Sequence, residues 1–423
     1  MGNGKQKRSG YSSRIIGRAK EIRDANAFEA RNEAKITASR IKADMRVSSK
    51  RNTIVMCLLS LAVLAVLAFS LLLPFVDVQY TGELLGKIYD PISVIECWKT
   101  WFYVTFGPLF DSSIKTQAPS IIAALTTAVP GVEYDTVITR GAASLAIIAC
   151  GCLLAISGLL FQATFRNPLA TPSMMGVTEG VTLGMIIYMV MGNSAMSNNP
   201  TLYYILVYAS GAVTLLFVLF GSRFISGGAT YNVFDMLLIG TVVVQILSGF
   251  NNYYTNFIID STVWDAFYDI SQCYETLQEP ISYAIVAVGF AATVIPTFLF
   301  RFRLNLVSFD DGEAHVAGVR PGVLRGLALA LGSIMQLVAV SAVGQVAMLS
   351  LVVPFLVRYL LPPDMRLQIV GNILLGSIVL LICFAAQHFI HVGNVPLSIG
   401  TAVGGIMVPL FVWIVALNKR GWD

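Results

Sequence analysis

The chain has 423 residues, of which 56% are hydrophobic and only 12% are charged, and its mean hydropathy is +0.72. Soluble globular domains usually contain about 25% charged residues, so this composition excludes an ordinary soluble protein. Many apolar stretches approach the ~20 residues that a membrane-crossing helix needs. The sequence therefore predicts an all-α membrane protein.

The first 52 residues form a separate, strongly basic segment. They contain 14 Lys and Arg against five acidic residues, a net charge of +9 that leaves −5 for the rest of the chain. No apolar run precedes residue 53, so the segment is not a signal peptide. Its composition from Arg14 to Met45 predicts a basic cytoplasmic helix. This helix would lie on anionic lipid or contact a partner, or remain a solvated tail that sets the topology.

Residues 53–423 are predicted to form the transmembrane domain, with about ten membrane-crossing helices. The predicted spans are 53–76, 139–163, 171–192, 202–222, 233–258, 281–300, 322–343, 345–361, 367–390 and 397–417. Between the first two spans, residues 77–137 include Pro108, Pro119, Pro130 and scattered charges, which argue against a full span. We expect this stretch to be an extracytoplasmic insertion with short interfacial helices.

Charge predicts the orientation of these spans. Basic residues fall on one side, in the N-terminal segment, at Arg166, Arg223, the 301–325 loop, Arg358, Arg366 and Lys419-Arg420. The opposite side has the acidic segments 77–137 and 259–280. Both termini are therefore predicted to be cytoplasmic. Spans two to five and spans seven to ten then form two inverted blocks of four helices, a common transporter design.

The sequence contains no pattern that indicates an enzyme or a cofactor bound by this chain. It lacks the Gly-x4-Gly-Lys-Ser/Thr loop that cradles ATP phosphates, and it shows no Ser/His/Asp set or paired carboxylates. The three histidines and six cysteines have no spacing typical of a metal site. Cys97 and Cys273 both fall in predicted external segments, so a disulfide between them is one option.

One run of residues resembles a known transporter family. It comprises Gln162, Arg166-Asn167-Pro168-Leu169-Ala170 and Met175-Gly176-Val177, after a hydrophobic stretch that ends in Ser157-Gly158. This run resembles the permease subunits of iron-siderophore, haem and cobalamin ABC importers, the FecCD-type family. Further matches at Leu351-Val352-Val353-Pro354 and in residues 395–401 extend the resemblance over residues 139–417.

The resemblance implies a permease subunit of a type II ABC importer in the bacterial plasma (inner) membrane. A second permease subunit, identical or paralogous, would complete the path, and two ATPase subunits would hydrolyse ATP. An extracytoplasmic binding protein would deliver a ferric siderophore or a related metal chelate, with haem and cobalamin as alternative cargoes. Membrane lipid is an expected contact and nucleic acid is not. The alternative from another class is an ion-coupled secondary transporter.

The 301–325 loop resembles the family's cytoplasmic coupling segment, which seats on the ATPase subunit. The residues assigned to coupling are Asp310, Asp311, Ala314, His315, Gly318 and Val319. An aspartate at a helix start accepts hydrogen bonds from free backbone N–H groups, and Gly318 permits a left-handed turn. Gly312 and His315 stand where the family usually has Glu and Arg. The alternative is an ordinary cytoplasmic loop with solvated acids.

Span five carries a polar stripe. Thr241, Gln245, Ser248 and Asn252 are spaced at i, i+4, i+7 and i+11, which places them on one helical face. Such a stripe usually faces a bundle interior or a wet cavity. The resemblance implies that this helix and the last one line the translocation pathway, where Ser398 and Thr401 would contribute. The alternative role is hydrogen bonding between helices.

Two single residues complete the predicted sites. Glu179, in or near span three, is either a functional intramembrane acid or a residue stabilised by the helix dipole. Arg140 lies near the start of span two and matches one of the two arginines with which relatives dock a binding protein. Ala143 occupies the second of these positions.

Overall fold

The computed structural model describes residues 50–68, 70, 96–100, 103–104, 117, 119–123, 134–191, 199–225, 233–257, 280–305, 321–346, 348–362, 364–387, 391–392 and 395–418. By internal contacts the chain divides into Met1–Leu58 and Leu59–Asp423. A 19-residue apolar helix, Lys50–Ala68, includes this boundary and is long enough to span a membrane. The predicted basic segment 1–52 lies outside the described residues except for its last three.

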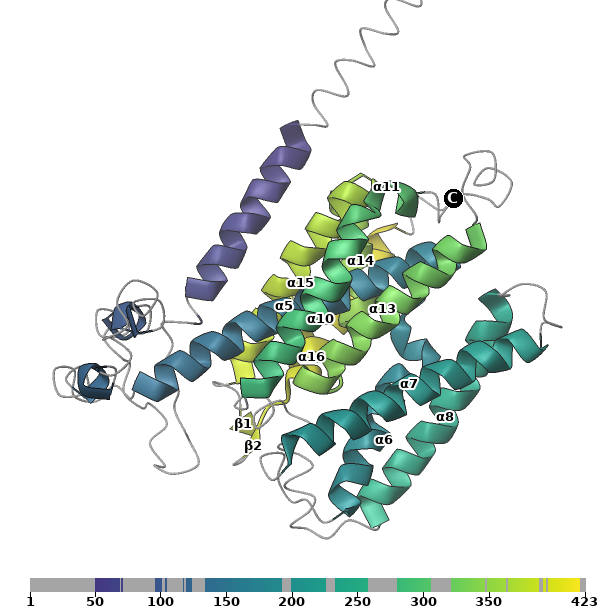
Figure 1. Ribbon diagram of the computed structural model, residues 1–423. Helices are drawn as coiled ribbons and strands as arrows, with labels where there is room; N and C mark the ends of the chain where they lie inside the picture. The colour runs from purple at the N-terminus through teal and green to yellow at the C-terminus, as the bar shows by residue number, and fades with distance from the viewer. Residues whose placement is uncertain are drawn as a thin grey trace, which may run out of the picture. The chain divides into compact units, whose positions relative to one another are not determined.

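The larger unit is built from helices (Figure 1). In chain order they are α5 (Tyr134–Phe165), the 3-10 helix η2 (Pro172–Met175), α6 (Val177–Val190), α7 (Pro200–Ile225), α8 (Val233–Phe257), α10 (Pro280–Leu299), α11 (Arg301–Leu304), α13 (Pro321–Val343), α14 (Leu349–Leu360), α15 (Met365–Gln387) and α16 (Ile399–Asn418). Among the described residues the only strands are β1 (His391–Val392) and β2 (Val395–Pro396), which pair antiparallel with His391 opposite Pro396. The all-α prediction is confirmed.

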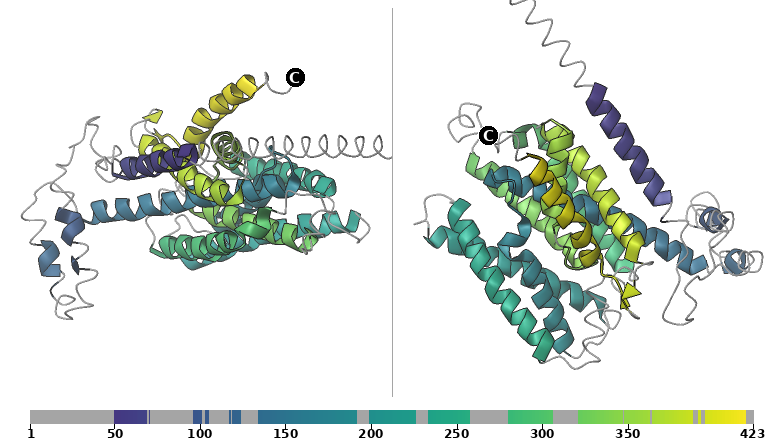
Figure 2. Two further views of the ribbon diagram at one scale, coloured as in Figure 1. Left: turned by 90° about the horizontal axis from the view of Figure 1, so that it is seen from above. Right: turned by 180° about the vertical axis from the view of Figure 1, so that it is seen from behind.

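Helix α5 forms the core of the larger unit. It packs against α10, α13, α14 and α15, and the views in Figure 2 show it running between them. The apolar stretch of α5 is 83% buried and that of α13 is 78% buried, against 28% for α7 and 22% for α8. Helices α7 and α8 therefore lie at the periphery and keep one face free for lipid or another subunit.

Two glycines allow α5 and α15 to approach closely. A Cβ atom added to Gly151 would lie 2.5 Å from the carbonyl oxygen of Gly376, and one added to Gly376 would meet the backbone of Gly151 in return. Next to this contact, the Cys152 Sγ and Ser377 Oγ atoms are 3.1 Å apart. Small residues at helix crossings are typical of membrane proteins, where close packing replaces the hydrophobic effect.

Replacing Gly151 with leucine is expected to lower the stability of the folded protein by about 1–3 kcal/mol or more, because the added side chain must push α15 away. The apparent melting temperature in detergent measures this change. Gly249→Leu on α8 is the matched control, because no described atom lies within 4 Å of a Cβ at Gly249. Equal losses in the two variants would contradict the close-packing interpretation.

The order of helix lengths recurs in the two halves of the larger unit. The lengths of α5, α6, α7 and α8 are 32, 14, 26 and 25 residues, and those of α13, α14, α15 and α16 are 23, 12, 23 and 20. In each half, left-handed residues flank the break between the first two helices: Arg166 and Gly176 in one, Gly344 and Met348 in the other. This recurrence supports two blocks of four helices.

The structure qualifies the prediction of ten spans. Within the described residues, seven helices are long and apolar enough to cross a membrane, and Val177–Val190, Leu349–Leu360 and Ile399–Ile414 are shorter apolar helices. At 1.5 Å per residue, the 12-residue α14 is about 18 Å long, less than the ~30 Å hydrocarbon core. The predicted span 345–361 is too long at its start. Gly344 and Met348 adopt left-handed conformations, so the helix begins only at Leu349.

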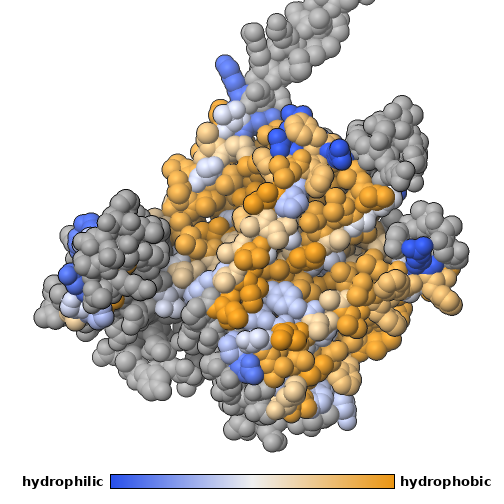
Figure 3. All heavy atoms as spheres, in the orientation of Figure 1, coloured by the Kyte–Doolittle hydropathy of each residue, from blue (hydrophilic) through white to orange (hydrophobic). Residues whose placement is uncertain are grey.

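Many large apolar side chains of α7 are exposed. Val213, Phe217, Phe220 and Phe224 are each at least 64% exposed, and the face drawn in Figure 3 is mostly hydrophobic. An exposed apolar surface of this kind is costly in water, and it suits contact with lipid. The membrane assignment made from composition therefore agrees with the surface that the helices present.

The predicted insertion 77–137 is described only in part. Residues 96–100, 103–104, 117 and 119–123 are helical, and α5 begins at Tyr134, so the predicted insertion is too long at its end. Cys97 is a free, buried thiol in this structure, which therefore lacks the disulfide that the sequence left open. Burial, and then the nearby Glu96 carboxylate, raise the pKa of Cys97. Cys273 lies outside the described residues.

Candidate translocation site

The predicted polar stripe lies on an exposed face of α8. Thr241, Gln245 and Asn252 are exposed and Ser248 is half-buried. The Thr241 hydroxyl donates to its own helix at Leu238 O (2.8 Å), and Asn252 Nδ2 donates to Ser248 Oγ (3.5 Å). Both hydrogen bonds stay within α8, and the role of the stripe, as a pathway lining or in contacts between helices, stays a prediction.

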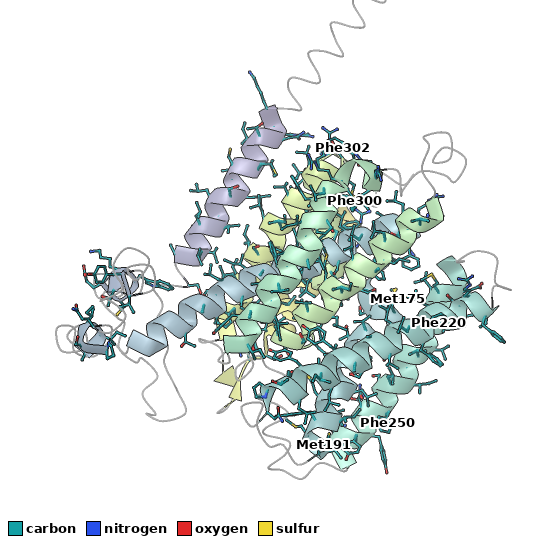
Figure 4. All side chains as sticks on the ribbon, viewed as in Figure 1. Met175, Met191, Phe220, Phe250, Phe300 and Phe302 are labelled. Carbon is teal, nitrogen blue, oxygen red and sulfur yellow. The ribbon has the colours of Figure 1, made fainter. Side chains whose placement is uncertain are left out.

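The opposite face of α8 packs against η2 and α6. Gly240 lies so close to the Met174 carbonyl that any Cβ there would clash, and Met175 fills the adjacent space (Figure 4). Gly176, between η2 and α6, has φ 74°, a left-handed conformation that glycine adopts without strain. Met175-Gly176-Val177 therefore fixes how α6 starts against α8.

Glu179 and Asn251 join α6 to α8. Glu179 lies in the first turn of α6. Asn251 Nδ2 donates to Glu179 Oε2 and to the Glu179 backbone carbonyl, both at 3.1 Å. Asn251 is only 4% exposed, whereas Glu179 is half-buried. The carboxyl group thus lies at a helix start and contacts a second helix, and both interpretations of Glu179 stay predictions.

The two predicted pathway residues at the start of α16 also have a structural role. Thr401 N donates to Ser398 Oγ (3.0 Å), and Ser398 Oγ donates to Thr401 Oγ1 (2.6 Å). Ser398 therefore caps the N-terminus of α16. Thr401 is exposed and Ser398 is half-buried, so both side chains stay at least partly accessible despite the capping interaction.

Three buried or partly buried amides were not predicted from the sequence. Gln336 on α13 connects Ser157 Oγ and Thr178 Oγ1, each at 3.3 Å, and so links α5, α13 and α6. Gln345, in the break after α13, donates to Thr182 Oγ1 (2.6 Å). Asn251 is the third. Its position beside Asn252 was a signal, but its partner on α6 was not visible in the sequence.

The family-like residues at the end of α5 contribute to helix packing. Gln162 Nε2 donates to the Leu351 carbonyl of α14 (3.0 Å), and Gly158 lets α5 approach Ser350. These contacts join two of the motifs that carry the resemblance. Phe355, which stands where the family usually has histidine, packs edge-on against Phe411 of α16 with ring centroids 5.7 Å apart.

The predicted coupling residues Asp310, Asp311, Ala314, His315, Gly318 and Val319 lie outside the described residues. The segment that precedes them is described. Asn305 accepts from Met365 N (2.8 Å) and donates to Asp364 Oδ1 (3.5 Å), at the start of α15. Arg140 lies within α5, but its side chain is not among the described parts.

The helical fold and the exposed apolar surface define a multi-pass membrane protein. The model of the FecCD transport family matches residues 101–416. The chain belongs to this family of transport permeases.

Known relatives cover most of the chain. It is 27% identical over 277 residues to the "Probable iron chelatin transport system permease protein" of Helicobacter pylori, covering 64% of this chain and 78% of that protein. It is 28% identical over 286 residues to the Fe(3+) dicitrate transport system permease protein FecC of Escherichia coli, covering 66% and 81%. It is 26% identical over 327 residues to the "Probable heme-iron transport system permease protein IsdF" of Staphylococcus aureus, covering 75% and 92%.

A solved structure shares the fold. A metal-chelate type ABC transporter in an inward-facing conformation superposes with a TM-score of 0.63 at 19% sequence identity, covering 86% of this chain and 99% of the solved one. At this level of identity the similarity shows the fold alone.

Proposed function

We propose that this chain is the permease subunit of an ABC importer that moves a ferric siderophore or a related metal chelate inward across the bacterial inner membrane. The observation that carries the proposal is the family match over residues 101–416. A second permease subunit would complete the path, two ATPase subunits would bind the cytoplasmic side, and an extracytoplasmic binding protein would deliver the cargo. ATP would bind only to the ATPase subunits.

The names of the relatives support an iron-containing cargo. The names of these relatives contain the words iron chelatin, Fe(3+) dicitrate or heme-iron. The exposed stripe of Thr241, Gln245 and Asn252 offers neutral polar groups, which suit a hydrophilic chelate better than an apolar surface would. Haem remains the alternative cargo from this group.

The proposed mechanism is alternating access driven from the cytoplasmic side. ATP-dependent closure of the ATPase subunits would move the coupling segments within 301–325, and each coupling segment would pull on the helices to which it is joined. Asn305 joins this segment to α15, and α15 packs on the central helix α5. The lining helices α8 and α16 would then tilt and expose the polar face to one side at a time. The basic segment 1–52 would stay a separate cytoplasmic element.

Gentle affinity purification from native membranes tests the proposal. We expect stoichiometric co-purification of an ATPase subunit with a phosphate-binding loop. Gly318→Pro should abolish this association, because proline cannot adopt the left-handed turn predicted at that position. The wild-type chain and Gly404→Ala serve as controls. A Cβ atom added to Gly404 in α16 has no described atom within 4 Å, so this substitution should be tolerated. A stable complex with no nucleotide-binding subunit would overturn the proposal and favour an ion-coupled transporter with Glu179 as its ion site.

A further inference from the structure

The environment of Glu179 restricts the charge of the cargo. This inference rests on the proposed function and concerns the same path. Glu179 precedes Gly180, and a Cβ at Gly180 would touch Thr214, which lies near the middle of α7 (Pro200–Ile225). The first turn of α6 therefore packs beside the middle of α7, and the half-buried Glu179 carboxyl group contacts Asn251 in the last two turns of α8. Carboxyl groups within membrane-spanning helices are rare and are functional candidates by default.

No cation lies close to balance this carboxyl group on the elements that pack against α6. Those elements are η2, α7, α8 and α13. Their basic residues are Arg223, in the last turn of α7, and Arg325, in the first turns of α13. Neither the Lys99–Glu96 nor the Arg366–Asp364 ion pair of the described residues involves Glu179.

A second acceptor lies beside the Glu179 carboxyl group and lacks a hydrogen-bond donor. Asn251 Oδ1 is buried and has no hydrogen-bond partner among the described residues. The side chain is 4% exposed, and its Nδ2 is already used by Glu179. A buried acceptor without a donor is costly. Glu179 Oε2 accepts from Asn251 Nδ2, whereas Asn251 Oδ1 has no donor, so the pair retains acceptor capacity for a donor group of a ligand.

This acceptor pair borders the polar stripe of α8. Asn251 precedes Asn252 and follows Ser248 by three residues, so on the helix it lies between the stripe and the face packed on α6. Glu179 keeps partial exposure at this border. A cargo that passes the stripe would therefore meet the pair.

We infer that Glu179 and Asn251 form an acceptor site in the translocation path that favours metal chelates with a positively charged or hydrogen-bond-donating group over anionic chelates. An ammonium or hydroxyl group of the chelate would donate to the Glu179 carboxyl group and to Asn251 Oδ1. A carboxylate-rich chelate would bring acceptors to acceptors and negative charge to negative charge, which is unfavourable. The site therefore acts as a charge filter, in addition to the selectivity of the binding protein.

Three forms of one ferric trihydroxamate test this inference: one with a free primary ammonium, one N-acetylated and one N-succinylated. They share the iron centre and differ in net charge by one unit at each step. Uptake is measured in proteoliposomes that contain the complete transporter and its binding protein. We expect the ratio of ammonium-form to succinyl-form uptake to fall by about tenfold in Glu179→Gln, the size expected when one charge interaction of moderate strength is lost.

Two variants control for folding and for net charge. Glu179→Asp keeps the carboxylate and should retain most of the ratio. Asp235→Asn removes the same charge from the first turn of α8, away from the Asn251 contact, and should leave the ratio unchanged. Equal ratios in the wild type and Glu179→Gln, or an equal shift in Asp235→Asn, would overturn the inference. Uptake that does not depend on ATP would instead overturn the proposed function.

Discussion

Replacing Asn305 with leucine is expected to reduce ATP-driven uptake about tenfold or more while the ATPase subunit stays bound, a loss within the usual range of coupling free energies. Asn305 is the last described residue before the predicted coupling residues. Its side chain accepts from Met365 N (2.8 Å) and donates to Asp364 Oδ1 (3.5 Å), so it joins α11 to the first turn of α15. Leucine has a similar volume but can make neither hydrogen bond.

The surrounding contacts explain why this junction can transmit movement. The Arg366 guanidinium lies 4.2 Å from the centroid of the Phe302 ring, and Figure 4 shows Phe300 and Phe302 together at this end of the bundle. Asp364 caps α15 by accepting from Arg366 N (3.0 Å). From there α15 reaches α5 through the Gly376–Gly151 contact. In the proposed mechanism, a pull on the segment after Asn305 would therefore act on a helix that contacts the core.

Uptake and ATP hydrolysis are measured side by side in proteoliposomes. In Asn305→Leu we expect hydrolysis to continue while uptake is lost, a separation that misfolding would not produce. Asn199→Leu is a matched control, because Asn199 also accepts from a helix N-terminus, at Leu202 N (3.1 Å), but at the start of α7. Unchanged uptake in Asn305→Leu, or loss of the ATPase subunit from the complex, would contradict the proposed role.

The helices at the periphery could be predicted well from the sequence. The predicted span 202–222 corresponds to Pro200–Ile225, and 233–258 corresponds to Val233–Phe257. In these regions, apolar runs end at charged or polar residues, and hydropathy follows the same boundary as the backbone. The start of the predicted span 345–361 was wrong, because left-handed Gly344 and Met348 delay the helix to Leu349. The surrounding residues are apolar, so hydropathy does not detect this break.

The polar site could be predicted only where it depends on one helix. The stripe of α8 follows from the 3.6-residue period, which needs no tertiary information. The pairing of Glu179 with Asn251 depends on how α6 starts against α8, and this geometry comes from Gly176 and Gly240. The sequence marked Glu179 as an unusual residue. It did not reveal Asn251 Oδ1, the second acceptor beside the carboxyl group, which is the basis of the proposed preference for donor groups.

The polar face of α8 should be sensitive to added volume. Gln245→Trp is expected to reduce ATP-driven uptake about tenfold or more, because passage depends on the diameter and the lining of the path. Gln245 is exposed and lies between Thr241 and Ser248 on the stripe. Ile246→Trp is the matched control: Ile246 is 66% exposed, and it lies about 100° around the helix from Gln245. Both variants should assemble with the ATPase subunit and hydrolyse ATP, which separates a blocked path from misfolding. If Ile246→Trp lost uptake and Gln245→Trp kept it, the path would run along the apolar side of α8, and the polar stripe would have another role.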